Sequence, residues 1–150
     1  EMFRTGEVHK TYWAITKNMP AIEEGRLEHW LVRNEKQNKS YAYTKEKPGA
    51  KKAVLEYKMI GRTDNYCLLE VRLLTGRHHQ IRCQLAKMGC PIRGDLKYGA
   101  PRSNPDGSIS LHAHRLTFEH PVSHLQIDVK ALLPQENVWQ SVQKLIEKQP

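Results

Sequence analysis

The apolar pattern of this chain changes period near its middle, and that change limits the folds open to it. Two runs, Val54 to Ile60 and Tyr66 to Leu74, place apolar residues at every second position, which is typical of half-buried strands. The polar segment Thr63 to Asn65 lies between them and is predicted to be a turn. The sequence therefore predicts an antiparallel hairpin.

A helical pattern follows this hairpin directly. Ile81, Leu85 and Met88 recur at helical spacing, and Gly89 is a natural end for the helix. We expect Thr75 to be the N-cap, because a hydroxyl can accept a hydrogen bond from the first turn. A strand is thus predicted to lead straight into a helix.

Further segments have the alternation or the β-forming residues of strands, and they are Val8 to Ile15, Arg26 to Val32, Ser40 to Thr44, Leu111 to Phe118 and Leu125 to Ala131. A loop rich in Gly and Pro is predicted from Cys90 to Gly107. An amphipathic C-terminal helix is predicted from Val138, Val142, Leu145 and Ile146. The sequence predicts an α+β fold with a mixed, mainly antiparallel sheet and flanking helices.

Charge narrows the partners that we expect. Lys and Arg outnumber Asp and Glu by 24 to 16, which gives a formal net charge of +8 and favours a polyanion such as RNA. No apolar run is long enough to cross a membrane, and no signal peptide is evident. Three irregularly spaced cysteines predict free thiols, so we expect a cytoplasmic protein.

The segment Thr75 to Arg82, which reads TGRHHQIR, carries the most chemical information. It joins the predicted strand to the predicted helix, and Gly76 allows a tight turn there. Arg77 and Arg82 lie close to the helix N-terminus, where free N–H groups attract anions. An arginine at this place can contact phosphate or hold a carboxylate in a bidentate pair.

This segment resembles the T-G-R-x-H-Q-I-R signature of the A-type family of ribosomal large-subunit pseudouridine synthases. Lys10 to Tyr12 matches the family's early K-x-Y element. Later positions follow the family pattern in order, and they are Leu85-Ala86, Gly89, Pro91-Ile92, Gly94-Asp95, Tyr98-Gly99, Leu111-His112-Ala113, Leu116, Phe118 and His120-Pro121. The resemblance thus spans roughly residues 8 to 121, and such an ordered series is more specific than any single motif.

The resemblance implies an enzyme that isomerises uridine to pseudouridine within ribosomal or transfer RNA, without a metal or an organic cofactor. It implies that Tyr12 packs on the base and assists proton removal, and that Arg82 pairs with a nucleophilic aspartate. Residues expected to contact the substrate are Ile81, Arg77, His79, Gln80 and Lys10. Lys10 and Tyr12 share one face of the predicted strand, where a tyrosine can stack on a flipped base.

Two departures from the family pattern stand out. The family's nucleophile lies in an H-R-L-D-x-x-T-S-G segment before K-x-Y, and no such segment occurs here. The other is Gln84, where relatives commonly carry histidine; we expect the change to be tolerated because Gln keeps a hydrogen-bonding group. Without the nucleophile, Arg82 is expected to lack its counter-ion, which is costly for a buried cation.

Two interpretations of the missing nucleophile stay open. The chain is either the C-terminal portion of a single catalytic domain, spanning residues 1 to 150, or a non-catalytic RNA-binding module derived from that fold. We favour the first, because the chain enters a strand pattern within a few residues, as a cut within a longer chain would. On either interpretation the chain alone is expected to be inactive.

Other candidate sites receive simpler interpretations. Asp95 is expected to brace its loop through backbone N–H groups, and Asp64 and Asp106 are expected to lie in turns. The pairs His112 with His114 and His79 with Cys83 lack a third ligand at metal-binding spacing, so no metal site is predicted.

Overall fold

The computed structural model describes residues 8–119, 123, 126–130 and 139. Within this part, seven strands form one sheet in the order β3-β2-β4-β5-β1-β6-β7, and each described ladder is antiparallel. The strands are β1 (Val8–Thr16), β2 (Glu24–Asn34), β3 (Lys39–Tyr43), β4 (Lys51–Arg62), β5 (Cys67–Leu73), β6 (Leu111–Glu119) and β7 (Gln126–Lys130). The helices are α1 (Gln80–Lys87) and the short 3-10 helix η1 (Leu96–Tyr98).

This arrangement confirms the predicted α+β class and the predicted strand pairs. The β4–β5 hairpin and the β6–β7 pair form as expected. β4 is longer than its alternating stretch, because its first residues pair with β2, where Lys51 lies opposite Leu31. The predicted loop from Cys90 to Gly107 contains η1. The predicted C-terminal helix lies outside the described residues, apart from Trp139.

The sheet buries apolar side chains on both faces, as alternation along a strand requires. On one face, Ala14 of β1 joins Leu55 and Leu69 in a cluster with Ile81 and Leu85 of α1. The opposite face carries a second cluster, formed by Trp13, Ile15, Leu68 and Trp139. Burying a leucine such as Leu85 completely stabilises the fold by about 2 kcal/mol, so this packing fixes α1 against the sheet.

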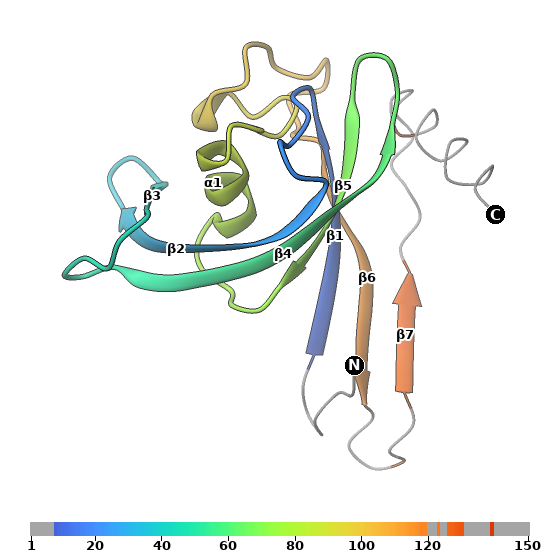
Figure 1. Cartoon of the computed structure of the whole chain (residues 1–150), viewed down its shortest axis with the longest axis horizontal. Coiled ribbons are helices and arrows are strands. Elements are labelled where there is room, and N and C mark those ends of the chain that lie inside the picture. The colour runs from blue at the N-terminus through green and yellow to red at the C-terminus, as the bar shows by residue number, and fades with distance from the viewer. Residues whose placement is uncertain (1–7, 120–122, 124–125, 131–138, 140–150) are drawn as a thin grey trace.

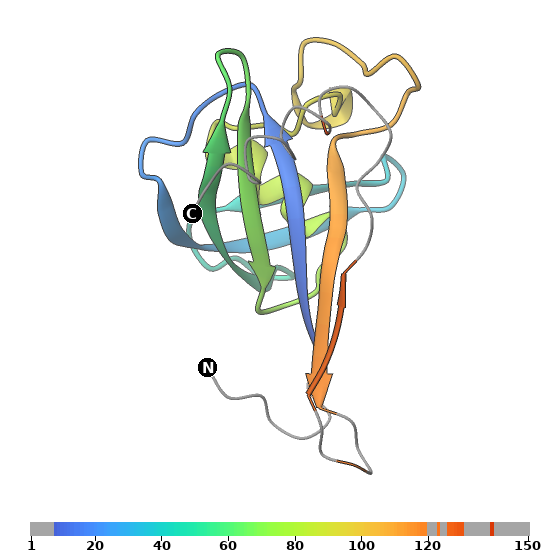
Figure 2. The same ribbon diagram turned by 90° about the vertical axis from the view of Figure 1, so that its right-hand side faces the viewer.

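The sheet is strongly curved, and the curvature creates the place that α1 occupies. β2 and β4 bend away from β1 and β6, with β3 at their far end, and α1 lies in the resulting angle (Figure 1). A view at right angles shows α1 behind the sheet and the β6–β7 pair extending past the other strands (Figure 2). Apart from the sheet, α1 contacts η1, which positions the loop after the helix. No helix in the described part of the chain is long and apolar enough to span a membrane.

Candidate functional site

The turn that precedes α1 is held by side-chain hydrogen bonds to β4. The Thr75 hydroxyl accepts a bond from the Val54 N–H at 2.9 Å and lies 2.8 Å from Gln80 Oε1, to which it donates. The prediction that Thr75 is the N-cap is therefore wrong, because the helix begins four residues later than that capping position implies. His79 is the N-cap residue, in the left-handed region at φ 54°, and its side chain makes no capping bond.

Gln80 connects this turn to the rest of the domain. Its side chain is 2% exposed, and Oε1 also accepts a bond from the Arg77 N–H at 2.9 Å. Its Nε2 donates to the Val54 carbonyl and to Gln84 Oε1. These bonds use both the oxygen and the nitrogen of the Gln80 amide within the fold, so Gln80 positions the segment around Arg77.

Arg82 forms a bidentate pair with Asp95. Its Nε and Nη2 donate to the two carboxylate oxygens at 2.9 and 2.8 Å, and Asp95 is 1% exposed. These bonds raise the pKa of Arg82, with the Asp95 hydrogen bond as the largest cause. Two expectations are thereby corrected. Arg82 has a counter-ion, which is Asp95. The Asp95 carboxylate binds the Arg82 guanidinium instead of the backbone N–H groups of its loop, because a charge-assisted bidentate pair is stronger than a hydrogen bond from a neutral N–H.

His79 and Tyr98 complete the surroundings of Arg82. Arg82 Nη1 donates to His79 Nε2 at 3.1 Å, since a guanidinium has no acceptor. The neutral ring then carries its proton on Nδ1 and donates to the Tyr98 hydroxyl at 2.9 Å, which also accepts from the Ser40 N–H. Burial and the Arg82 charge lower the pKa of His79 to about 4, so the ring is neutral at pH 7.

Tyr12 lies on β1 between β5 and β6, opposite Val71 and Ala113. It is partly buried and packs against the cluster that contains Ile81, so these two predicted site residues meet in one region. The β1–β6 register shifts between Thr11 and Tyr12, and such irregularities re-aim side chains beside functional sites. No described contact joins Tyr12 to Arg82, and Lys10 is exposed on the same strand.

Arg77 and Gln84 differ in their surroundings. Arg77 is exposed and donates from Nε to the Lys52 carbonyl at 2.9 Å. Gln84 is fully buried, and its Nε2 lies 2.9 Å from His29 Nδ1 and 3.2 Å from the Ala53 carbonyl. The expectation that Gln84 keeps a hydrogen-bonding role is met.

Asp95 and Tyr98 were not predicted as site residues. Both lie in the loop that follows α1, and Asp95 is 13 residues from its partner Arg82. The available signal was the match of Gly94-Asp95 and Tyr98-Gly99 to the same family pattern that contains Arg82. Their contact depends on how the loop folds back, which residue spacing does not predict.

The chain is similar to several RNA-modifying proteins. Residues 1–87 match the family model described as RNA pseudouridylate synthase. An uncharacterized RNA pseudouridine synthase of Bacillus subtilis is 30% identical over 129 residues, covering 86% of this chain and 42% of the relative. Ribosomal large subunit pseudouridine synthase D of Zymomonas mobilis is 32% identical over 142 residues, covering 89% and 44%. The chain thus spans less than half the length of these two relatives.

A solved structure shows the same fold. The human protein RNA pseudouridylate synthase domain containing 4 superposes with a TM-score of 0.73 at 24% identity, covering 93% of this chain and 62% of the human chain. The family match includes β1 with Tyr12 and extends through α1 with Arg82, that is, over more than half of the sequence. This chain belongs to the RNA pseudouridylate synthase family.

Proposed function

We propose that the protein carrying this chain isomerises uridine to pseudouridine in ribosomal or transfer RNA, and that residues 1 to 150 form the C-terminal portion of its catalytic domain. Family membership supports the reaction class. The names of two relatives, a ribosomal large subunit pseudouridine synthase and a tRNA pseudouridine synthase of Vibrio cholerae, support RNA as the substrate. The three buried free cysteines support a reducing, cytoplasmic location.

The observation that carries this proposal is the hydrogen bonding of the Arg82 guanidinium. The described contacts use three of its five N–H donors, two toward Asp95 and one toward His79. Its side chain keeps a 21% exposed fraction. Asp95 therefore neutralises and orients the guanidinium, while two donors stay available for a second carboxylate. In the proposed reaction, that carboxylate is the nucleophilic aspartate.

We propose that the nucleophile comes from a part of the native polypeptide outside this chain. Asp64 lies exposed in a turn, and Asp106 is exposed and bonded to Ser108. Asp95 is occupied by Arg82, and Asp128 lies on the edge strand β7, opposite Thr117. In the reaction the aspartate attacks the nucleotide and the bond from C1′ to N1 of the base breaks. The base then turns, a bond from C1′ to C5 forms, and the bond to the aspartate breaks, which restores the free carboxylate. The proton on C5 then leaves, and N1 ends protonated, so the change is an isomerisation.

Tyr12 and Ile81 are proposed to hold the base during this turn. Ile81 is 5% exposed and offers an apolar surface, and Tyr12 is partly buried beside the same cluster. A tyrosine ring can stack on a base, and its hydroxyl can assist removal of the C5 proton. Lys10 and Arg77 are proposed to contact phosphates. His79, which is hydrogen-bonded to Arg82, is proposed to lie next to the substrate.

Replacing Tyr12 with Phe in the native protein separates catalysis from binding. The ring and its stacking surface remain, but the hydroxyl that takes part in proton removal is lost. We expect turnover, measured as tritium release from RNA labelled at C5 of uracil, to fall by about 100-fold or more. RNA affinity is expected to stay within about twofold of wild type.

The matched control is Tyr41→Phe, on exposed β3, which should leave both quantities unchanged. The alternative is an RNA-binding module without catalysis, and it is favoured if the native wild-type protein binds RNA but releases no tritium. Full turnover in the Tyr12→Phe variant would remove the role assigned to its hydroxyl.

A further inference from the structure

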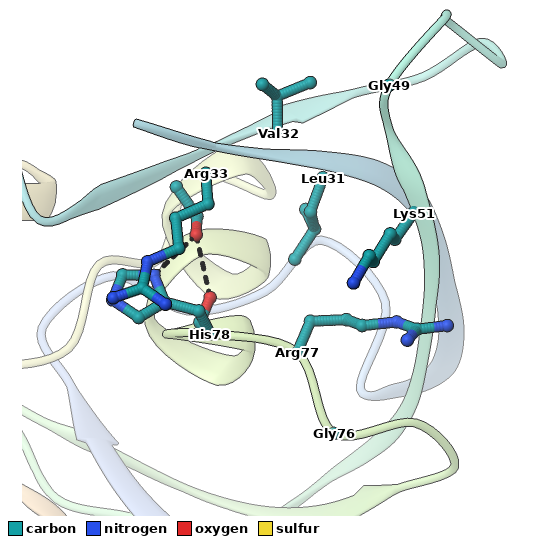
Figure 3. A pocket seen from close by; sticks show the side chains of 9 residues that line it. Leu31, Val32, Arg33, Gly49, Lys51, Gly76, Arg77 and His78 are labelled. Atoms are coloured by element: carbon teal, nitrogen blue, oxygen red, sulfur yellow. Dashed lines mark hydrogen bonds between the residues drawn. The ribbon is translucent and has the colours of Figure 1, made fainter. Parts of the chain in front are cut away.

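A hollow of about 340 Å³ lies between the far ends of β2 and β4 and the turn before α1 (Figure 3). Three long cationic side chains reach it from three separate segments: Arg33 from β2, Lys51 from β4 and Arg77 from the turn. The remaining lining residues are Leu31, Val32, Ser40, Gly49, Gly76 and His78. None of the lining residues is an Asp or a Glu, so the cations are not neutralised within the hollow.

The cations that line the hollow differ from their neighbours on the same strands. Arg26 on β2 and Lys52 on β4 both bond to Glu28, at 3.1 and 3.2 Å. Arg33 and Lys51 have no such carboxylate partner in the described part of the chain. Arg77 is exposed and is anchored through Nε to the Lys52 carbonyl, which leaves its two terminal nitrogens without a described protein partner. The fold thus gathers cations here without matching acids.

The pKa of His78 reflects the positive potential beside the hollow. Burial is the largest cause that lowers the pKa of His78, and the charges of Arg33, Arg82 and Lys97 lower it further. Its ring lies 2.9 Å from the Ser40 hydroxyl, and its other nitrogen lies 2.9 Å from Asn38 Oδ1. The ring is therefore fixed in place beside the cations, and a bound anion would stabilise its protonated form.

Gly76 leaves open space at the wall of the hollow. Its backbone is not in the left-handed region, and a Cβ placed on it would meet no other atom within 4 Å. Neither backbone conformation nor packing in the described structure requires a glycine at this position. A bare backbone at the wall of a basic hollow lets an anion approach the peptide closely.

We propose that this hollow binds one backbone phosphate of the RNA, at a nucleotide other than the target uridine. The identity of the polyanion rests on the proposed function. A phosphodiester matches the site because it carries one negative charge and accepts bidentate bonds from arginine. The sheet order places β5 and β4 between β1, which carries Tyr12, and β2. Three strand spacings amount to about 14 Å, so the hollow and the base site contact different nucleotides.

The test compares two double variants of the native protein. Arg33→Ala with Lys51→Ala empties the hollow of two cations. Lys36→Ala with Lys45→Ala is the matched control, because both lysines are exposed, neither lines the hollow, and the same two charges are lost. The probe is a fluorescein-labelled transfer RNA transcript, titrated by anisotropy over a series of salt concentrations. Equal urea midpoints establish that both variants are folded.

We expect the variant that lacks Arg33 and Lys51 to lose about tenfold in RNA affinity at low salt. The slope of log affinity against log salt concentration should become shallower by the equivalent of about one phosphate contact. The control should stay within about threefold of wild type. The phosphate contact is equally strong in the ground state and in the transition state. The variant that lacks Arg33 and Lys51 should therefore have a higher KM and an unchanged kcat. Equal losses in both variants overturn the proposal and leave RNA binding intact.

Two other outcomes also overturn the proposal. If wild-type protein binds no RNA, then RNA as a partner fails together with the hollow. If inorganic phosphate shifts the Gly76 amide resonance in wild type only, while both variants bind RNA equally, then the hollow takes free phosphate and the RNA assignment is wrong. The supporting result requires a selective loss of RNA affinity in the Arg33 and Lys51 variant.

Discussion

Arg82 and Asp95 show how the fold neutralises a largely buried cation. A lone buried guanidinium is costly, but Asp95 supplies two short hydrogen bonds and the opposite charge. Tyr98 adds a ring whose centroid lies 5.0 Å from the Arg82 guanidinium carbon. The pair fixes the guanidinium of Arg82, and two of its five N–H donors have no partner among the described contacts.

Asp95→Asn should destabilise the fold, because the amide removes the charge and one acceptor while Arg82 stays ionised. We expect the free energy of unfolding to fall by about 3 kcal/mol, the lower end for a broken buried pair, since the Arg82 side chain keeps some exposure. Urea denaturation at pH 7 measures this change. Asp64→Asn, in an exposed turn, is the control and should change stability by less than about 0.5 kcal/mol. Similar effects of the two substitutions would contradict the role of the pair.

His79 makes stability depend on pH. Its pKa falls from 6.5 in the unfolded chain to about 4 in the fold, so the unfolded state binds more protons between these values. The stabilisation is complete above pH 6.5 and is lost as the pH falls toward 4. Between pH 7 and pH 5 the loss from this residue is about 2 kcal/mol.

His79→Asn tests this linkage, because Asn adopts the left-handed backbone and does not titrate in this range. The free energy of unfolding of the variant should fall less steeply from pH 7 to pH 5 than that of wild type. His29, whose pKa is also lowered, remains in both proteins and contributes equally, whereas His78 stacks on the His79 ring and loses this neighbour in the variant. Parallel pH profiles of variant and wild type would show that His79 does not titrate as described.

At the scale of elements, α1 begins where it does because the preceding turn is bonded to β4. Thr75, Gln80 and Val54 form a closed set of hydrogen bonds, and the helix starts only after His79 has turned the chain through the left-handed region. The entry to the helix is thus determined by contacts to a distant strand rather than by a local cap. Arg77 lies within this turn, and Arg82 lies in the first turn of α1.

Thr75→Val and Thr75→Ser form a matched pair that measures this connection. Valine keeps the shape but removes the hydroxyl, which leaves the Val54 N–H without its partner and Gln80 Oε1 with only the Arg77 N–H as donor. We expect a loss of about 2 kcal/mol in the free energy of unfolding for Thr75→Val, and less than about 1 kcal/mol for Thr75→Ser. Thermal or urea unfolding provides the comparison. A Thr75→Val variant as stable as Thr75→Ser would mean that the hydroxyl does not hold the turn.

The sequence was most informative where a local period decides the structure. Alternation predicted β5 and most of β1 and β4, and helical spacing predicted α1 with its end near Gly89. The start of α1 was predicted wrongly, because Thr75 carries a capping hydroxyl that the fold uses to bond β4 instead. The pairing of Arg82 with Asp95 was missed for a similar reason, since it depends on tertiary contacts of a loop.

At the scale of the whole molecule, one curved sheet presents two sites at different strands. β1 carries Tyr12 at a register shift, while β2 and β4 carry the cations of the basic hollow. Ile81 of α1 packs in the cluster that Tyr12 contacts, and the turn before α1 carries Arg77 at the hollow. We expect the formal charge of +8 to add a general attraction for RNA, and we propose that the two sites determine which nucleotides are bound.

The most direct test of the proposed catalytic role is tritium release from uracil-labelled RNA by the native protein and its Arg82→Lys variant. Lysine keeps the positive charge but cannot form the planar fork that pairs with Asp95 and with the nucleophile. We expect the wild-type protein to release tritium in step with pseudouridine formation, and the variant to lose nearly all turnover while still binding RNA. Unchanged turnover in the variant, or no release by the native wild-type protein, would contradict the assignment of Arg82 to the catalytic site.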